Sequence, residues 1–193
     1  MRYDAEHKQR THQKVVQEAA IALREHGPDG IGVADLMKRA GLTVGGFYAH
    51  FKSKDVLIAE AIDHMFDDRY ELFRDSMAGV PPAQGLALYV DRYLGTLHRQ
   101  RRGTGCPMPA LSGDVARLPA LARKRFEAGA QRIVDSIAAV LRELKRPNPL
   151  ALAQSALAEM VGAIAISRAI ADTELAEQTL EATRKSIKAR LGL

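Results

Sequence analysis

Side chains that donate hydrogen bonds are gathered just after a pair of glycines near residue 45. The donors are Tyr48, His50, Lys52 and Lys54. Gly45 and Gly46 each cost about 1 kcal/mol relative to alanine inside a helix, and a segment that accepts this cost usually needs its backbone close to another molecule. Small residues followed by hydroxyl, imidazole and ammonium donors suit a helix in a DNA major groove, flanked by phosphate contacts.

Two short helices joined by a tight turn are needed to position this segment. The first helix has an apolar face at spacings of three and four, formed by Val33, Leu36, Met37 and Ala40. Gly41 can take a positive φ and end that helix, and the Thr43 hydroxyl can cap the next one. The second helix is expected over residues 44–50, with Phe47 and Phe51 anchoring it from behind. The pattern predicts a helix-turn-helix.

The segment AGLTVGGFYAHFKSKDVLIAEAI closely resembles the end of the DNA-binding domain of TetR-family transcriptional repressors. The matching residues, in one register, are Gly41, Thr43, Tyr48, Phe51, Ser53 and Lys54. The motif-level match covers about the first 60 residues, and beyond it only length and helical pattern agree. One position departs from the family: Gly32 stands where a threonine often caps the helix and contacts a phosphate.

The donor pattern and the resemblance together select candidate DNA contacts. Bases or the adjacent sugar-phosphate would be approached by Thr43, Val44, Gly45, Gly46 and Tyr48. Phosphates would be held mainly by Tyr48, His50, Lys52 and Lys54, with Arg10 near the start of the first helix. Residues 1–54 carry nine basic and six acidic residues, so DNA binding is argued from the motif and not from bulk charge.

Apolar periodicity predicts an all-α chain of about nine helices. They are expected over residues 8–26, 33–40, 44–50, 54–77, 83–99, 107–115, 119–144, 150–171 and 174–191. The first three form a helix-turn-helix DNA-binding head, residues 1–53. The others form a helical-bundle body for effector binding and dimerisation, residues 54–193. The long helix from residue 54 joins the two parts.

The composition fits a globular protein of a reducing compartment. Hydrophobic residues make up 47% and charged residues 26% of the 193 residues, and the net charge is +5. A single cysteine excludes an internal disulfide framework, and the polar start of the chain is no signal peptide, so we expect a cytoplasmic protein. The apolar run 150–170 is interrupted by Gln154, Glu159 and Arg168, which favours a buried interface helix over a membrane span.

The body is expected to pair two chains and to bind a small molecule. The helix at 150–171 is too apolar for a monomer surface, so the last two helices are predicted to form a homodimer, which an inverted-repeat operator also requires. The TetR resemblance implies the same dimer, and a repressor that an unknown small-molecule effector releases from double-stranded operator DNA. Candidate effector contacts are Met65, Phe66, Tyr70, Tyr89, Tyr93, Phe126 and Met160, for which core packing is the competing interpretation.

Cys106 carries two open interpretations. It precedes Pro107, where a helix N-terminus would favour the thiolate, and Arg99, Arg101 and Arg102 would add positive potential. An exposed, activated cysteine could sense electrophiles or oxidants, as in some TetR-like repressors. The alternative is a small buried apolar side chain. The three arginines could also bind an acidic ligand, although a solvated loop is the commoner outcome for such a run.

Two further function classes compete with a ligand-released repressor. Glu60, His64 and Asp68 recur at every fourth residue and could share a helix face, which raises a helical-bundle metalloenzyme. Their spacing is not that of Glu-x-x-His pairs, no second copy exists, and no phosphate loop or nucleophile motif occurs. We therefore expect no enzyme, no metal and no cofactor. The third class is a constitutive DNA-binding protein without a ligand.

Overall fold

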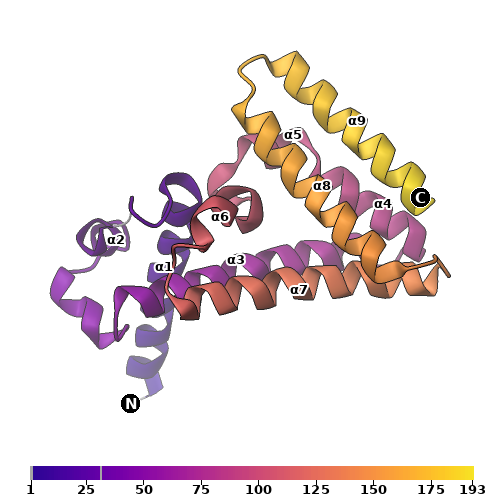
Figure 1. Ribbon diagram of the computed structural model, residues 1–193. Helices are drawn as coiled ribbons and strands as arrows, with labels where there is room; N and C mark the ends of the chain where they lie inside the picture. The colour runs from indigo at the N-terminus through magenta and orange to yellow at the C-terminus, as the bar shows by residue number, and fades with distance from the viewer. Residues whose placement is uncertain (1, 31) are drawn as a thin grey trace.

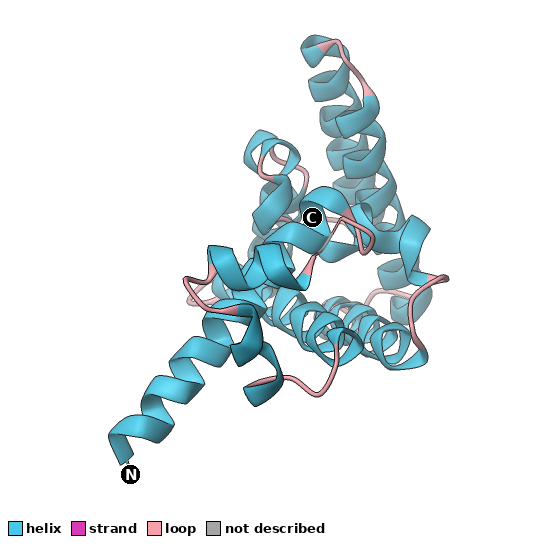
Figure 2. Ribbon diagram, turned by 90° about the vertical axis from the view of Figure 1, so that its left-hand side faces the viewer, coloured by secondary structure: helices cyan, strands magenta, loops and turns pink. Residues whose placement is uncertain are grey.

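The computed structural model describes residues 2–30 and 32–193 of the chain, with side chains described from residue 6 onward, and this part is all helical (Figures 1 and 2). The α-helices are α1 (Arg2–His26), α2 (Val33–Arg39), α3 (Lys54–Met77), α4 (Pro82–Tyr93), α5 (Thr96–Gln100), α6 (Pro107–Val115), α7 (Ala120–Glu143), α8 (Pro149–Ala169) and α9 (Thr173–Leu191). Two 3-10 helices are η1 (Val44–Ala49) and η2 (Arg102–Thr104). The predicted fold class is confirmed.

The head is formed by α1, α2 and η1, and its turn has the predicted chemistry. Gly41 has φ +76°, and the N–H groups of Gly41 and Leu42 donate to the carbonyls of Lys38 and Met37, as in a Schellman motif. Phe47 and Phe51 are buried as expected. The helix expected over residues 44–50 is present as η1, and it is a 3-10 helix, which two glycines favour because they weaken regular α-helix.

Capping differs between the two helix starts in this region. The side chain of Thr43 makes no hydrogen bond at the start of η1, so that expected cap is wrong. Ser53 does cap α3, because its hydroxyl accepts a hydrogen bond from the Val56 N–H at 3.3 Å. Gly32 precedes α2 without any side-chain cap, as its lack of a hydroxyl dictates.

Helices α3 and α7 lie side by side and form the long base of the body (Figure 1). Phe66 of α3 packs onto Gly129 of α7 so closely that a Cβ at Gly129 would lie 2.2 Å from the phenyl ring. Ion pairs link the same two helices at the surface, from Arg125 to Asp63 and from Arg132 to Asp67. The buried core runs without a break from the head into the body, and the division at residues 53 and 54 stays a prediction.

The predicted helix over residues 83–99 is two helices. Leu94 ends α4, and Gly95 has extended angles, φ −87° and ψ 155°, before α5 begins. A Cβ at Gly95 would lie 3.1 Å from the Asp91 carbonyl oxygen, so the bend leaves little room for a side chain. Because of this break, α5 and η2 do not continue the axis of α4.

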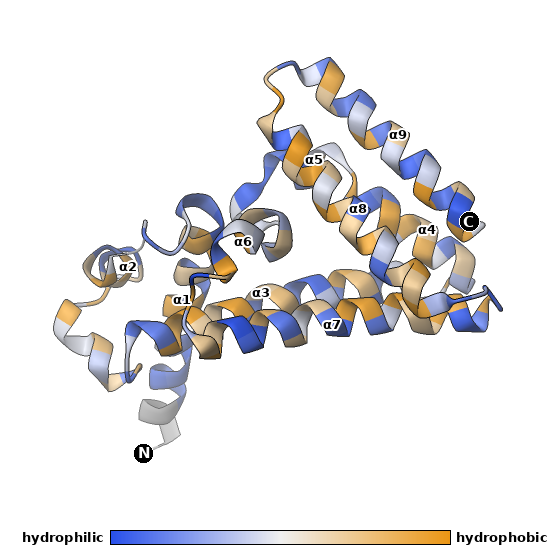
Figure 3. Ribbon diagram, in the orientation of Figure 1, coloured by the Kyte–Doolittle hydropathy of each residue, from blue (hydrophilic) through white to orange (hydrophobic). Residues whose placement is uncertain are grey.

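Helices α8 and α9 pack together on the far side of the body, and α8 is largely apolar (Figures 1 and 3). By length and composition alone α8 could cross a membrane, and only 39% of its apolar window is buried within the chain. Its charged residues have partners in this fold: Arg168 donates to the carbonyls of His98 and Arg99, and Glu159 pairs with Arg190 of α9. The α8–α9 pair is thus integrated into the helical body.

Candidate functional site

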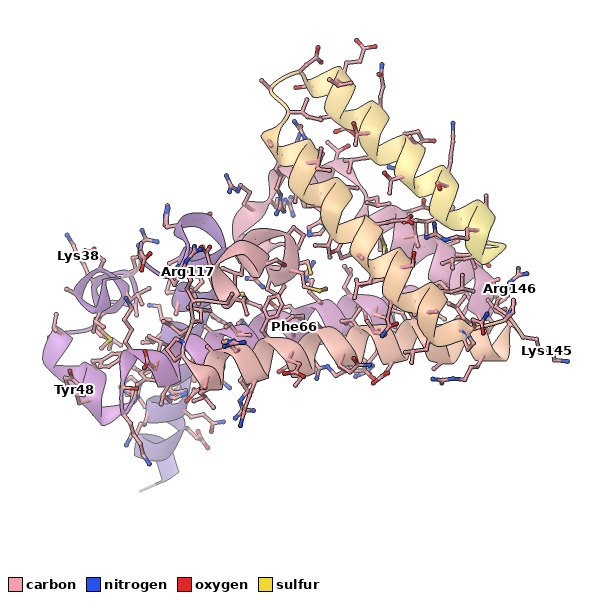
Figure 4. All side chains as sticks on the ribbon, in the orientation of Figure 1. Lys38, Tyr48, Phe66, Arg117, Lys145 and Arg146 are labelled. Atoms are coloured by element: carbon pink, nitrogen blue, oxygen red, sulfur yellow. The ribbon has the colours of Figure 1, made fainter. Side chains whose placement is uncertain are left out.

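The outer face of η1 exposes the residues predicted to meet DNA bases. Tyr48 is 78% exposed and Val44 is 52% exposed, both high values for large apolar side chains. Thr43 and Gly45 are exposed as well, and Gly46 is half-buried. Figure 4 places Tyr48 at the outer edge of the head, away from the body helices. The structure therefore brings these residues onto one free surface.

The two glycines of η1 are not there to make room within the fold. A Cβ at Gly45 would meet no atom of the chain within 4 Å, and one at Gly46 would make ordinary contacts with Thr43 and Met37. Neither residue has a positive φ. The fold thus accepts side chains at both positions, which leaves close approach of an outside molecule as a reason for glycine.

The predicted phosphate donors differ in their availability. Lys52 and Arg10 are exposed, whereas Lys54 donates to the Pro28 carbonyl at 3.4 Å. His50 is half-buried with its Nδ1 atom buried and unpartnered. Its pKa is lowered, first by burial and then by the nearby His12 and Lys8, so at neutral pH it offers a neutral ring.

His12 is a head residue that the sequence analysis missed. Its ring stacks on Phe51 with the centroids 4.4 Å apart, and its Nε2 atom lies 2.6 Å from Oε2 of Glu60 on α3. His12 therefore joins α1, the helix-turn-helix and α3. No local pattern could reveal it, because its partners are 39 and 48 positions away along the chain.

Arg24 is a second residue that the sequence analysis missed. It is only 3% exposed, and its guanidinium donates to the Gly103 carbonyl at 2.9 Å and to Asp68 of α3 at 3.4 Å. Burial lowers its pKa to about 10, so it stays charged at neutral pH. Gly103 packs tightly on α1, since a Cβ there would lie 2.6 Å from the Glu25 carboxylate. Arg24 ties the head helix to both α3 and η2.

The predicted effector contacts lie in the interior of the body. Met65, Phe66, Tyr89, Tyr93 and Met160 are buried, and Tyr70 and Phe126 are half-buried. Phe66 and Phe126 are in edge contact, with their centroids 5.4 Å apart. None of the seven lines any of five hollows formed by the described residues. Their role in effector binding stays a prediction.

Cys106 precedes α6 as expected, but it is not an activated thiol. Its exposed fraction is 1%, and burial raises its pKa, which outweighs the opposing influence of Tyr93 and the backbone of Met108. The expectation of an exposed thiolate is therefore wrong. Of the three nearby arginines, Arg99 is engaged with the carbonyls of Ser167 and Ile170. A sensing role for Cys106 stays a prediction.

His98 links the Cys106 segment to the helices before it. Its Nε2 atom accepts a hydrogen bond from the Cys106 N–H at 2.8 Å, and its Nδ1 atom lies 2.6 Å from the Tyr93 carbonyl, to which it donates. Burial lowers the pKa of His98 to about 4, so the ring is neutral at pH 7. This one ring holds α4, α5 and the start of α6 together.

The acidic and histidine residues of α3 do not form a metal site. Glu60 faces His12 of α1, and His64 lies 3.9 Å from Asp68. Within residues 2–30 and 32–193, no group of three or more His, Cys, Asp and Glu side chains is placed to hold a metal ion. The metalloenzyme alternative has no support in this geometry.

Comparisons with known proteins agree with the head and with the whole fold. The sequence model of the family described as "Bacterial regulatory proteins, tetR family" matches residues 15–61, from α1 into α3. A TetR transcriptional regulator from Chloroflexus aurantiacus J-10-FL has a TM-score of 0.80 at 25% identity, over 100% of this chain and 97% of its own. Residues 15–61 thus match the TetR family, and the chain as a whole has the fold of a TetR regulator.

Other relatives are described as regulators too. The HTH-type transcriptional repressor DhaR of Mycobacterium sp. (strain GP1) is 27% identical over 113 residues, which is 58% of this chain and 55% of DhaR. The chain thus spans about half the length of the curated relatives it matches. A TetR-family regulator from Agrobacterium tumefaciens shares the fold, with a TM-score of 0.81 at 19% identity over 94% and 98% of the two chains. None of these three relatives is described as an enzyme.

Proposed function

We propose that this TetR-family chain is a dimeric transcriptional repressor that a small-molecule effector releases from an inverted-repeat operator. The observation that carries the proposal is the free, glycine-rich face of η1. It exposes Tyr48 and Val44 and leaves open space at Gly45, at the position where a helix-turn-helix protein reads the major groove. Lys52 and Arg10 flank this face with exposed cations for phosphates.

Dimerisation is supported by two rows of small side chains on the free faces of α8 and α9. The residues of the α8 row, at spacings of four and three, are Ala151, Ser155, Ala158, Gly162, Ala165 and Ala169. The α9 row continues the pattern with Thr179, Ala182, Ser186 and Ala189. Small residues let helices of two chains approach closely, and the exposed Ile166 and Leu175 add apolar area beside the rows. Two heads in one dimer would match the two half-sites of an inverted-repeat operator. Such a protein would act in the cytoplasm, where the DNA lies.

The experiment that tests the function is selection of bound genomic fragments by the purified protein at near-physiological salt. An enriched inverted repeat is the expected result, and the neighbouring genes would indicate the effector. A matched selection with the variant Gly45→Val, which the fold accepts, should lose the enrichment. If wild-type protein and variant give the same weak, salt-sensitive binding without a common motif, the proposed function is wrong.

A further inference from the structure

A hollow of about 560 Å³ opens where α3, α4, α5 and η2 meet, and we call it the α3–η2 hollow. Its lining includes two leucines, Leu72 and Leu97, and three arginines, Arg69, Arg92 and Arg101. Leu97 is 63% exposed, which is unusual for a leucine in the body. The volume lies in the range of small-molecule sites, and the wall offers both apolar and cationic contacts.

Arg69 is a cation of this wall for which the described residues supply no partner. Among the described residues none forms an ion pair or hydrogen bond with it, and its Nε atom is fully buried and unpartnered. The neighbouring Asp68 is occupied by Arg24, and Asp91, across the hollow, is paired with Lys188 at 2.6 Å. Arg69 as a whole is half-buried, and a guanidinium that finds no acceptor within the chain is suited to an anion supplied from outside it.

The other groups of the wall leave the balance of charge positive. Arg92 donates to the Ser76 hydroxyl, a neutral acceptor, at 3.0 Å, and Arg101 is exposed. The Asp91 carboxylate is neutralised by Lys188 and by Arg184, which lies 3.6 Å away. Both ring nitrogens of His98 are used within the fold, so this residue adds no charge and offers no free atom. The hollow therefore favours an anionic head group with an apolar part along Leu72 and Leu97.

Two walls of the hollow, α3 and η2, are both hydrogen-bonded to the same residue of the head, Arg24 of α1. Asp68, next to Arg69 on α3, accepts a hydrogen bond from Arg24 of α1. The Gly103 carbonyl of η2, between Arg101 and Thr104 of the opposite wall, accepts another from the same guanidinium. A ligand that draws α3 and η2 together or apart would thus act directly on Arg24, and through it on α1.

We propose that the α3–η2 hollow is the effector site, that its effector is a small amphipathic anion bound by Arg69, and that occupation is passed to the DNA-binding head through Arg24. The effector role rests on the proposed function, whereas the preference of the hollow for anions does not. The site differs from the seven interior residues that the sequence indicated, none of which lines this hollow.

The test uses a pair of fluorescent probes with the same aromatic rings. Anilinonaphthalene sulfonate carries a negative charge, and N-phenylnaphthylamine carries none. Titrated into the full-length protein, the sulfonate should bind at least about tenfold more tightly, because a hydrogen bond to a charged group typically contributes that much. Equal affinity for the two probes would overturn the proposed anion site.

Three variants locate the binding. Arg69→Met should abolish the preference for the sulfonate and Arg69→Lys should restore part of it, while Arg74→Met, an exposed arginine of the same helix outside the hollow, should change nothing. Leu97→Glu places a carboxylate in the hollow at an exposed position and should also abolish sulfonate binding, with an unchanged helical spectrum. Sulfonate binding that survives both Arg69→Met and Leu97→Glu would show that the anion binds elsewhere.

A DNA titration separates the two levels of the proposal. With an enriched operator fragment, saturating sulfonate should weaken binding of the wild-type protein at least about tenfold, in the usual range of allosteric coupling. The Arg69→Met variant should bind the operator, and its operator affinity should not change when sulfonate is added. Sulfonate that binds at Arg69 without changing operator affinity would overturn the effector role alone. A wild-type protein that binds no operator would overturn the proposed function, and the probe titrations would still decide the anion preference.

Discussion

Gly45 is a residue that the fold does not require to be glycine but that the proposed DNA contact does. A Cβ there would meet open space, so the fold does not need glycine, and yet the residue sits on the exposed face of η1. The helix-turn-helix interpretation explains the glycine by the close approach of DNA to the backbone. The test is therefore a substitution that adds bulk without disturbing the core.

We expect Gly45→Val to weaken operator binding at least about tenfold while the free energy of unfolding changes by less than about 1 kcal/mol, as for most surface substitutions. Operator titration and urea denaturation of the same preparation measure the two effects. Gly113→Val serves as control, because a Cβ at this body position also meets nothing within 4 Å. Normal operator affinity in a folded Gly45→Val protein would show that the backbone does not approach DNA there.

Lys52 and Lys54 differ in a way that a salt titration should reveal. Lys52 is exposed, whereas Lys54 already donates a hydrogen bond to the Pro28 carbonyl. Lys52→Ala should weaken binding to all DNA sequences and flatten the slope of log K against log salt by about 0.9, the value for one phosphate contact. Lys54→Ala should flatten it by the same amount or less. Lys185→Ala, on α9, should leave the slope unchanged; a slope unaffected by Lys52→Ala would remove Lys52 from the interface.

At the scale of elements, His98 links α4, α5 and the start of α6 only while its ring is neutral. Its Nε2 atom accepts the Cys106 N–H, and burial holds its pKa at about 4, below the usual 6.5. The unfolded chain therefore binds a proton between these two pH values before the folded chain does, so stability falls as the pH drops from about 6.5 to about 4.

The expected loss from this one group is about 3 kcal/mol across that pH interval. Urea unfolding at several pH values, compared between the wild-type protein and His98→Gln, isolates it from the carboxylates that titrate in both proteins. The variant should be less stable at pH 7 and should lose less stability on acidification. Parallel pH profiles for the two proteins would mean that folding does not change the pKa of His98.

The helices could be predicted from sequence where local chemistry decides them. Asp172 caps α9 by accepting from the N–H groups of Glu174 and Leu175, Pro107 begins α6, and Ser53 caps α3, so these helices begin within one residue of their expected starts. The bend at Gly95 was not predicted, because an isolated glycine in an apolar helix pattern does not show whether the helix continues. The 3-10 form of η1 likewise depends on contacts with the rest of the head.

The candidate sites divide in the same way. The exposed face of η1 followed from a local motif, so its residues could be named in advance. The thiol of Cys106 could not be judged, since its raised pKa comes from burial that distant helices impose. The unpaired state of Arg69 was also invisible, because it depends on Asp68 and Asp91 being taken by Arg24 and Lys188 from elsewhere in the chain.

At the scale of the whole molecule, the small-residue rows of α8 and α9 predict how two chains meet. Gly162 lies in the middle of the α8 row, and a Cβ there would meet nothing within 4 Å of its own chain. Gly162→Leu should therefore leave the fold of one chain intact and weaken the dimer by at least about tenfold, since overpacking of a close contact typically costs 1–3 kcal/mol.

Sedimentation equilibrium of Gly162→Leu against Gly113→Leu measures this effect, with the second variant adding the same side chain on α6. Operator affinity should fall together with the dimer in the first variant only. A Gly162→Leu protein that remains as dimeric as the control would remove the α8 row from the interface.

Helix α3 begins in the head, at the cap on Ser53, and runs through the body as one helix to Met77. At 1.5 Å per residue, its 24 residues span about 36 Å. Over that length a tilt of about 5° displaces one end by roughly 3 Å, close to the ~3.4 Å rise of a single base pair. A tilt of the whole helix by an angle this small would shift a head by about one step along the DNA, so the angle of α3 would set which half-site spacing the proposed dimer fits.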